Sequence, residues 1–203
     1  MMPIAIPSIE QRLSVYTPPA VASHEQSRHA AVATILRENN HDTEALFILR
    51  ATSEDDPWSG HMAFPGGHRD PGDPSLRAAA ERETLEEIGL DLNLHARFLG
   101  EIDAVRANPR GRDINILVTP FVYVLEWEDP VLTPNYEVAD ILWGSLADMY
   151  SRNTLTRGEF EVAGQVLEYP GFSVGDHVVW GLTLRMLDQF FRMLDPDWQV
   201  IYE

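Results

Sequence analysis

The sequence contains no cysteine, which excludes disulfides and thiolate metal sites. This absence fits a reducing compartment, and we expect a cytoplasmic protein. Basic residues are also few, since 15 Lys and Arg stand against 32 Asp and Glu and give a formal net charge of −17. Affinity for nucleic acid needs clustered positive charge, so no nucleic-acid partner is expected. The excess carboxylates serve solubility, metal binding or both, and composition alone does not separate these roles.

Long apolar runs are missing as well. No stretch reaches the ~18 apolar residues that a membrane-spanning helix needs. The start, MMPIAIPSIEQRLSVYTPP, lacks the basic end and the long apolar segment of a signal peptide, so no membrane partner is expected. The 203 residues, 44% of them hydrophobic, are enough for one domain with its own core. We expect an extended or partly helical N-terminal arm at 1–27 and one domain at 28–203.

The secondary-structure pattern mixes strands and helices without regular alternation. Strands are predicted at 30–36, 45–50, 61–64, 96–102, 115–125 and 140–143, and helices at 145–151 and 178–194. The clearest helix follows Asp73, which we expect to cap it, with Pro74 at its first position and Gly89 at its end. The Pro-Gly-Gly segment at 65–67 should break regular structure. This pattern favours an α/β protein with a mixed sheet between helices over a doubly wound parallel sheet.

The chemistry is concentrated in residues 64–90, FPGGHRDPGDPSLRAAAERETLEEIGL. Glu83, Glu86 and Glu87 fall at i, i+3 and i+4, so a helix places them on one face. Such carboxylates repel one another by roughly a few tenths of a kcal/mol per exposed pair, and by more when buried. A hard divalent cation such as Mg²⁺, or Mn²⁺, would relieve this repulsion, whereas the alternative is a solvated acidic surface. The preceding glycine pair, the adjacent Arg82 and the closing glycine favour the metal site.

These residues resemble a known family. Arg82–Leu90 (REx2EExGL), together with the upstream FPGG at Phe64–Gly67, resembles the Nudix box, G-x5-E-x7-R-E-U-x-E-E-x-G-U, in which U is aliphatic. The chain departs from it at Asp73, which replaces the first Glu and is separated from Arg82 by eight residues rather than seven, and at Thr84, which replaces an aliphatic residue. An Asp with the longer spacer is similar to the coenzyme A pyrophosphatase branch, as is VVWGLT at Val178–Thr183.

That branch carries a further signature before FPGG. The chain matches it at Arg50-Ala51 and Gly60, but Asp55 and Asp56 stand where the branch has an internal Arg. The resemblance spans roughly residues 30–194, and only the box and this flank are specific. It implies an α/β/α sandwich in which the box forms a loop–helix–loop.

The resemblance also implies an activity: metal-dependent hydrolysis of a phosphoanhydride in a nucleoside diphosphate derivative. The first candidate substrate is coenzyme A or an acyl-CoA, whose hydrolysis gives phosphopantetheine and 3′,5′-ADP. The second candidates are NADH, ADP-ribose and a nucleotide sugar. A non-catalytic Nudix-fold binding module is the rival from another class. The expected partner is a small-molecule nucleotide, and a homodimer is left open.

Residue roles follow from the same match. Glu83, Glu86 and Glu87 match the metal-binding glutamates, and Gly66 or Gly67 is in place to lend a carbonyl, with Gly67 preferred. Arg82 matches the arginine that braces the helix by pairing with a box carboxylate. A carboxylate can also accept the proton of the attacking water, and Glu86 is our first choice for this base.

Residues outside the box offer weaker candidates. Arg50 and Arg69 could contact phosphate, or form surface ion pairs. Trp58 could stack on a base, or act as a buried anchor. Other carboxylates and arginines are candidates for ligands, bases or phosphate contacts, although ordinary surface roles are favoured for them: Glu101, Asp103, Glu137, Arg106, Arg110 and Arg112. Trp180 is expected to pack in the core.

Overall fold

The computed structural model describes residues 4–20, 28–40, 42–53, 58–107, 115–126, 130–162 and 164–201. In this part of the chain, eight strands form one sheet, with the path β3-β2-β1-β7-β5 and with β4, β6 and β8 paired to β1, β7 and β2. A second sheet has the order β11-β10-β9. The elements are α1 (Ile6–Leu13), β1 (Arg28–Asn39), β2 (Asp42–Arg50), β3 (Met62–Ala63), β4 (Gly66–His68), α2 (Leu76–Ile88), α3 (Leu92–His95), β5 (Ala96–Glu101), β6 (Val105–Ala107), β7 (Ile116–Leu125), β8 (Val138–Ser145), α4 (Leu146–Tyr150), β9 (Leu155–Val162), β10 (Gln165–Val174), β11 (His177–Trp180) and α5 (Gly181–Leu194).

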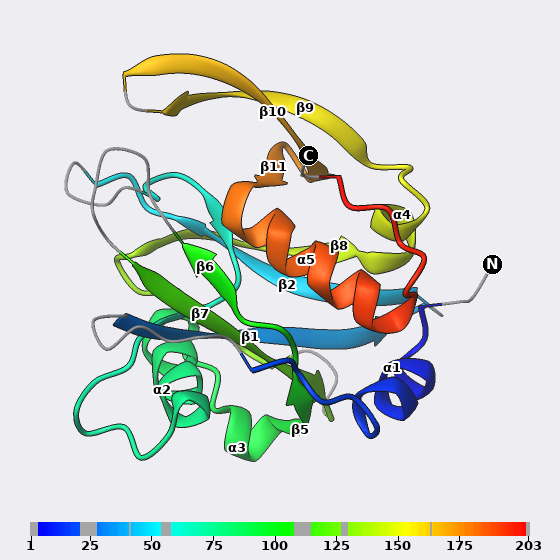
Figure 1. The fold of residues 1–203 in the computed structure, drawn as a ribbon. Coiled ribbons are helices and arrows are strands. Elements are labelled where there is room, and N and C mark those ends of the chain that lie inside the picture. The colour runs from blue at the N-terminus through cyan, green and yellow to red at the C-terminus, as the bar shows by residue number, and fades with distance from the viewer. Residues whose placement is uncertain are drawn as a thin grey trace.

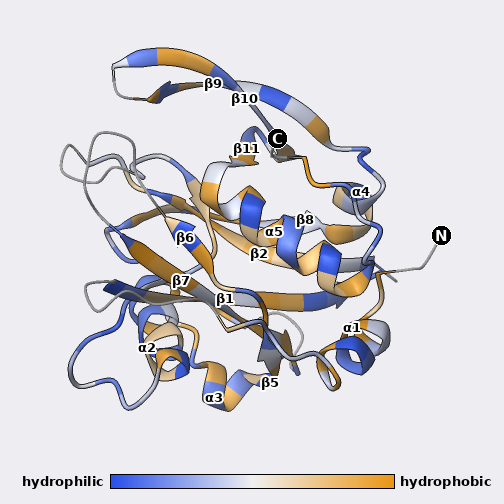
Figure 2. Ribbon diagram, viewed as in Figure 1, coloured by the Kyte–Doolittle hydropathy of each residue, from blue (hydrophilic) through white to orange (hydrophobic). Residues whose placement is uncertain are grey.

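The main sheet lies between helices, as Figure 1 shows: α2 and α3 cover one face, and α5 lies across the other. Strands β1 and β7 pair in parallel at the centre, and the neighbouring pairs are antiparallel. Alternate side chains of β1 enter two cores, with Val32 and Leu36 on the α5 side and Ala33 and Ile35 on the α2 side. Both faces of β1 are therefore buried, which explains its nearly continuous apolar sequence. Figure 2 shows the matching hydrophobic colour along β1 and β7. The predicted α/β fold with a mixed sheet is confirmed.

The N-terminal segment packs on the domain. Ile6, Ile9 and Leu13 of α1 are buried in the same core as α5. Farther along, the Tyr16 hydroxyl donates a hydrogen bond to Asp103. Helix α1 thus lies within the predicted arm and is anchored to the domain by apolar burial, while the boundary of the arm stays a prediction. No helix in the described residues is long and apolar enough to cross a membrane.

The box helix α2 begins later than predicted. Its N-cap is Ser75, whose hydroxyl accepts a hydrogen bond from the Ala78 N–H at 3.1 Å, so the predicted cap at Asp73 with Pro74 at the first position is wrong. Asp73 is instead engaged by Arg82, which leaves the shorter Ser75 side chain to cap the helix. The end at Gly89 is confirmed, since this glycine adopts the left-handed conformation with φ 70°.

Two further predictions need correction. Val178–Trp180 belongs to strand β11, paired with β10, and helix α5 starts only at Gly181, where φ is 59°. The partner strand β10 decides this, because an apolar run is compatible with either a strand or a helix. The Pro-Gly-Gly segment does not break structure completely either, since Gly66 and Gly67 pair with β1 as strand β4. A Cβ on Gly66 would lie 2.2 Å from the Ala31 carbonyl oxygen, so only glycine permits this close pairing.

Candidate active site

Glu87 is the most deeply buried carboxylate of α2, with 2% of the residue exposed. One of its oxygens accepts the Gly66 N–H at 2.8 Å, and the other lies 3.8 Å from the nearest Arg50 guanidinium nitrogen. Burial raises the pKa of Glu87 to about 7, and the negative charges of Glu83 and Glu137 act in the same direction. The Gly66 hydrogen bond and Arg50 only partly oppose this shift. A bound cation would relieve the cost of ionising this carboxyl group.

Glu83 lies one helical turn earlier and faces the second glycine of the pair. A Cβ on Gly67 would stand 2.6 Å from the carboxyl carbon of Glu83, so the absence of a side chain at Gly67 lets the carboxylate approach strand β4. Burial raises the pKa of Glu83, and the charges of Glu86 and Glu137 add to the shift, while Arg82 lowers it. Glu83 and Glu87 therefore form an anionic wall against Gly66 and Gly67.

Arg82 ties the box loop to the helix. Its Nε and Nη2 donate to the two oxygens of Asp73 at 3.1 and 3.0 Å, and Nη2 also donates to the His68 carbonyl at 3.0 Å. Its Nη1 donates to Glu83 at 2.8 Å and to Glu86 at 3.4 Å. The Arg82 hydrogen bonds lower the pKa of Asp73, so this residue stays ionised. Asp73, which stands where the box usually has its first Glu, thus accepts the hydrogen bonds that hold Arg82 in place.

The remaining box positions are also accounted for by the structure. Glu86 is more exposed than Glu83 and Glu87, with 57% of its side chain accessible, and lies at the rim of this site within 3.4 Å of Arg82. Thr84 is fully buried, and its hydroxyl donates to the Ala80 carbonyl at 2.7 Å, which satisfies its polar group inside the α2 core. The i, i+3, i+4 spacing therefore brings Glu83 and Glu87 together. Glu86 is linked to Glu83 through Arg82, which donates hydrogen bonds to both.

The chemistry of these residues fits a hard cation. In the described residues, no group of three or more His, Asp or Glu side chains is placed to hold a metal ion by itself. The carboxylates of Glu83 and Glu87 next to the Gly66–Gly67 strand instead fit an ion that keeps several waters and shares its coordination with phosphate, as Mg²⁺ does.

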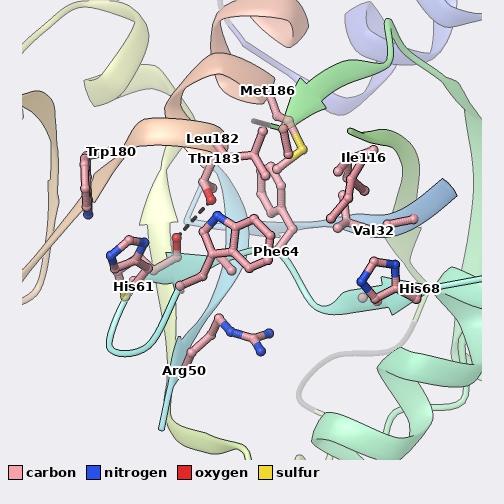
Figure 3. Close-up of a pocket in the computed structure, with 18 residues that line it drawn as sticks. Val32, Arg50, His61, Phe64, His68, Ile116, Trp180, Leu182, Thr183 and Met186 are labelled. Carbon is pink, nitrogen blue, oxygen red and sulfur yellow. Dashed lines mark hydrogen bonds between the residues drawn. The ribbon is translucent and has the colours of Figure 1, made fainter. Parts of the chain in front are cut away.

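A pocket of about 160 Å³ opens beside this wall. Figure 3 shows Arg50, His61 and His68 toward one end of it, and Met186, Leu182 and Ile116 toward the other. Trp58 lines the pocket and also packs against the core, and its stacking on a base stays a prediction. The sequence has no lysine, so cationic contacts to a phosphate can come only from Arg, or from protonated His.

The other predicted residues are placed as follows. Arg69 donates to the Asp73 carbonyl, at 3.1 Å through Nη2, and does not line the pocket. Asp103 accepts the Tyr16 hydroxyl, and Glu101 is exposed on β5. Glu137 lies near enough for its charge to raise the pKa of both Glu83 and Glu87. Its neighbour Asn135 is fixed to the end of α2, and this long-range contact has no signal in the sequence. Asp55, Asp56, Arg110 and Arg112 lie outside the described residues.

The sequence analysis missed the apolar wall of the pocket. Trp180 is buried as predicted, but it also lines the pocket together with Leu182 and Met186. These residues were assigned to a single amphipathic helix, whose apolar face appears as ordinary core in the sequence. The strand-to-helix junction at Gly181 could have signalled the change of direction.

A mixed sheet lies between helices, and a glutamate-rich helix faces a glycine pair beside a pocket, which is the arrangement that the resemblance to the box implies. The family model described as NUDIX domain matches residues 27–163. The chain therefore belongs to the Nudix family, the class of hydrolases that act on pyrophosphate bonds, and the family prediction is confirmed.

The chain is also similar to three individual proteins. An uncharacterized protein of Schizosaccharomyces pombe is 37% identical over 130 residues, which cover 63% of this chain and 40% of that protein. The mitochondrial coenzyme A diphosphatase NUDT8 of Mus musculus is 29% identical over 153 residues, 74% of this chain and 70% of the relative. Among solved structures, the MutT protein from Methanosarcina mazei Go1 has a TM-score of 0.53 at 18% identity, covering 87% of this chain and all of that one, and this likeness concerns the fold alone.

Proposed function

We propose that this protein hydrolyses the diphosphate of a nucleoside diphosphate derivative with Mg²⁺ or Mn²⁺, and that coenzyme A or an acyl-CoA is its substrate. The products would be phosphopantetheine, or its acyl form, and 3′,5′-ADP. The observation that carries the proposal is the anionic wall of Glu83 and Glu87 against Gly66 and Gly67 at the edge of a pocket. The branch resemblance and the name of the mouse relative support coenzyme A.

The residues of the site have distinct tasks in this proposal. Glu83 and Glu87 would hold the metal, with Glu86 at the rim and the Gly67 carbonyl as further oxygen donors. Divalent metal supplies charge neutralisation of the phosphate oxygens and acidifies water. Arg82 keeps the glutamates in place through its contacts to Asp73 and Glu83.

Substrate binding and proton transfer involve the residues around the wall. Arg50 lines the pocket and lies beside Glu87, where it can reach a phosphate oxygen, and Trp58 offers an aromatic surface to the substrate. Arg69 could contact the phosphate only from the rim, since it is bonded to the box loop. Glu86, exposed at the rim, would accept the proton of the attacking water, and Glu137 is the second candidate for this task.

A substrate panel tests the proposal. Hydrolysis of coenzyme A, acyl-CoA, NADH, ADP-ribose, diadenosine polyphosphates and sugar nucleotides would be measured with Mg²⁺ and with Mn²⁺. Coenzyme A compounds should be cut fastest, and phosphopantetheine should appear as a product. If another dinucleotide is cut and coenzyme A is not, the assignment to the coenzyme A pyrophosphatase branch is wrong, whereas membership of the Nudix family is unaffected. If nothing is cut with either metal, a non-catalytic binding module is the better description.

Three other expectations remain predictions. The division into an arm at 1–27 and a domain at 28–203 would be tested by removing the arm and measuring the melting temperature. A homodimer would be tested by light scattering, and cytoplasmic location by cell fractionation.

A further inference from the structure

Part of the apolar lining of the pocket comes from the chain beyond the family-matched region. The family model ends at residue 163, whereas Trp180 lies in β11 and Leu182 and Met186 lie in α5. Ile116 and Val118 of β7 also line the pocket. The C-terminal elements therefore add a surface to the site that the family domain alone does not supply.

The two ends of this pocket differ in chemistry. Arg50 and His68 lie toward the end next to the glycine pair, and Met186, Leu182 and Ile116 lie toward the other (Figure 3). The one hydroxyl at the apolar end, that of Thr183, donates to the Met62 carbonyl at 2.9 Å. A heterocycle placed at the apolar end would lose hydrogen bonds to water without replacement, whereas an aliphatic chain would bury only apolar surface.

The tryptophan of the wall is held rigidly by the second sheet. The ring of Phe160 stacks on Trp180 with centroids 3.8 Å apart and planes at 17°, and Tyr169 stacks at 5.2 Å. His61 contacts the same ring edge-on at 4.6 Å. These rings come from β9, β10 and the segment before β3, and Figure 1 shows the β9–β10 hairpin extending over β11. Trp180 is thus a preformed side of the pocket.

We propose that Leu182 and Met186 of α5, flanked by Trp180, form a specificity pocket for an uncharged aliphatic arm carried on the diphosphate, and that an acyl group extending this arm strengthens binding. This inference rests on the proposed function and goes beyond it, because it assigns the preference to the C-terminal elements. Unbranched, polarizable Met186 suits a flexible chain of variable length. A second nucleobase, as in NADH or a diadenosine polyphosphate, is disfavoured there.

An acyl-chain series tests the preference. The values of kcat/KM for coenzyme A and its acetyl, butyryl and hexanoyl thioesters should rise by about fourfold for each methylene that becomes buried, and then level off when the pocket is full. ADP-ribose should be cut at least about tenfold less efficiently than hexanoyl-CoA. Equal values across the series, or a preference for ADP-ribose, would overturn the inference.

Substitutions locate the preference. Leu182→Gln and Met186→Gln should lower the ratio of kcat/KM for hexanoyl-CoA to that for coenzyme A by about tenfold or more, and Met186→Leu should preserve it. Leu94→Gln is the matched control, because Leu94 lies on α3 with 69% of the residue exposed and outside the pocket. If Met186→Gln does not fold, Leu182→Gln decides, since Leu182 is only partly buried. An unchanged ratio in a folded Leu182→Gln variant contradicts the proposal.

A binding measurement separates this inference from the proposed function. Hexanoyl-pantetheine lacks the diphosphate, so in EDTA it should quench tryptophan fluorescence saturably, through Trp58 and Trp180, without any turnover. Binding of this probe in a protein that cuts no nucleotide would support the pocket while the proposed activity fails. Hydrolysis of coenzyme A without such binding, or the absence of both, would overturn the pocket.

Discussion

Arg82 donates hydrogen bonds to both carboxylate oxygens of Asp73, from Nε at 3.1 Å and from Nη2 at 3.0 Å, across the loop that precedes the box helix. The same guanidinium reaches Glu83 at 2.8 Å and the His68 carbonyl at 3.0 Å. A planar fork with five donors can make such a set of contacts, whereas an ammonium group cannot. Only 8% of Asp73 is exposed, so its charge depends on this partner.

Arg82→Lys should therefore impair both stability and turnover. Loss of the fork leaves the Asp73 carboxylate poorly compensated, and we expect a loss of about 2–3 kcal/mol in the free energy of unfolding, with activity lowered by about 10–100-fold. Chemical denaturation and steady-state kinetics would measure these effects. Arg77→Lys on the same helix is the control, because the Arg77 side chain is 47% exposed, and the exchange should matter by less than about 1 kcal/mol.

The carboxylates themselves are tested by Glu86→Gln and Glu87→Gln. Both variants should lose most turnover, by about 100–1,000-fold, and stay folded. In Glu87→Gln the side-chain oxygen can still accept the Gly66 N–H, so the fold keeps its contact while the charge is lost. Steady-state rates, with circular dichroism for folding, would show this. Rates like those of the unsubstituted protein in either variant would contradict the assigned roles.

The raised pKa of Glu87, about 7, predicts a pH-dependent stability of the metal-free protein. Below the unfolded value of about 4.3, both states are protonated and nothing is lost. Between that value and about 7, the unfolded state ionises first, so stability should fall as pH rises, by up to about 4 kcal/mol. Melting in EDTA across this range should show the decline, and Glu87→Gln should reduce it and leave the smaller decline due to Glu83, whose pKa is also raised.

Metal binding reverses this dependence. Carboxylate ligands must be ionised, so the protein should release a proton when it binds Mg²⁺ near pH 6. The rise in melting temperature on adding Mg²⁺ should therefore be larger at pH 8 than at pH 6. Calorimetry in buffers of different ionisation enthalpy would detect the proton. The same shift at both pH values would argue against Glu87 as a ligand.

The glycine pair offers a contrast between function and folding. Gly67→Ala should push the Glu83 carboxylate aside, since its new Cβ would lie within 3 Å of all three carboxyl atoms, and should lower activity more than stability. Gly66→Ala should destabilise the fold, because its Cβ would meet the Ala31 backbone at a φ of 147°. Melting temperatures and rates for both variants would separate the two effects. A fully active Gly67→Ala would count against the close approach as a functional feature.

Glu137 lies outside the box, and the sequence favoured a surface role for it, but the structure brings its charge close to the site. Its charge acts on both Glu83 and Glu87, so Glu137→Gln should lower the pH at which Glu87 ionises and reduce turnover by about tenfold or more. The pH profile of kcat/KM would report the change. Glu101→Gln, exposed on β5, is the control and should leave the profile unaltered.

Local sequence determined the helix that carries the glutamates, its end at Gly89, the central strands and the family. These features depend on spacing, capping and apolar periodicity, which act over a few residues. The exact start of the helix was not predicted, because Asp73 and Ser75 are both good caps, and only the distant Arg82 decides between them. Likewise, an apolar run at 178–180 became a strand because β10 was available to pair with it.

By itself, the sequence placed an i, i+3, i+4 set of carboxylates on one helix, because helical geometry fixes that neighbourhood. Tertiary structure alone decided that Glu87 is buried against Gly66, that Glu137 faces it, and that Trp180 and Met186 wall the adjoining pocket. These relationships join segments dozens of residues apart. They arise from sheet pairing and core packing, whose partners no local pattern specifies.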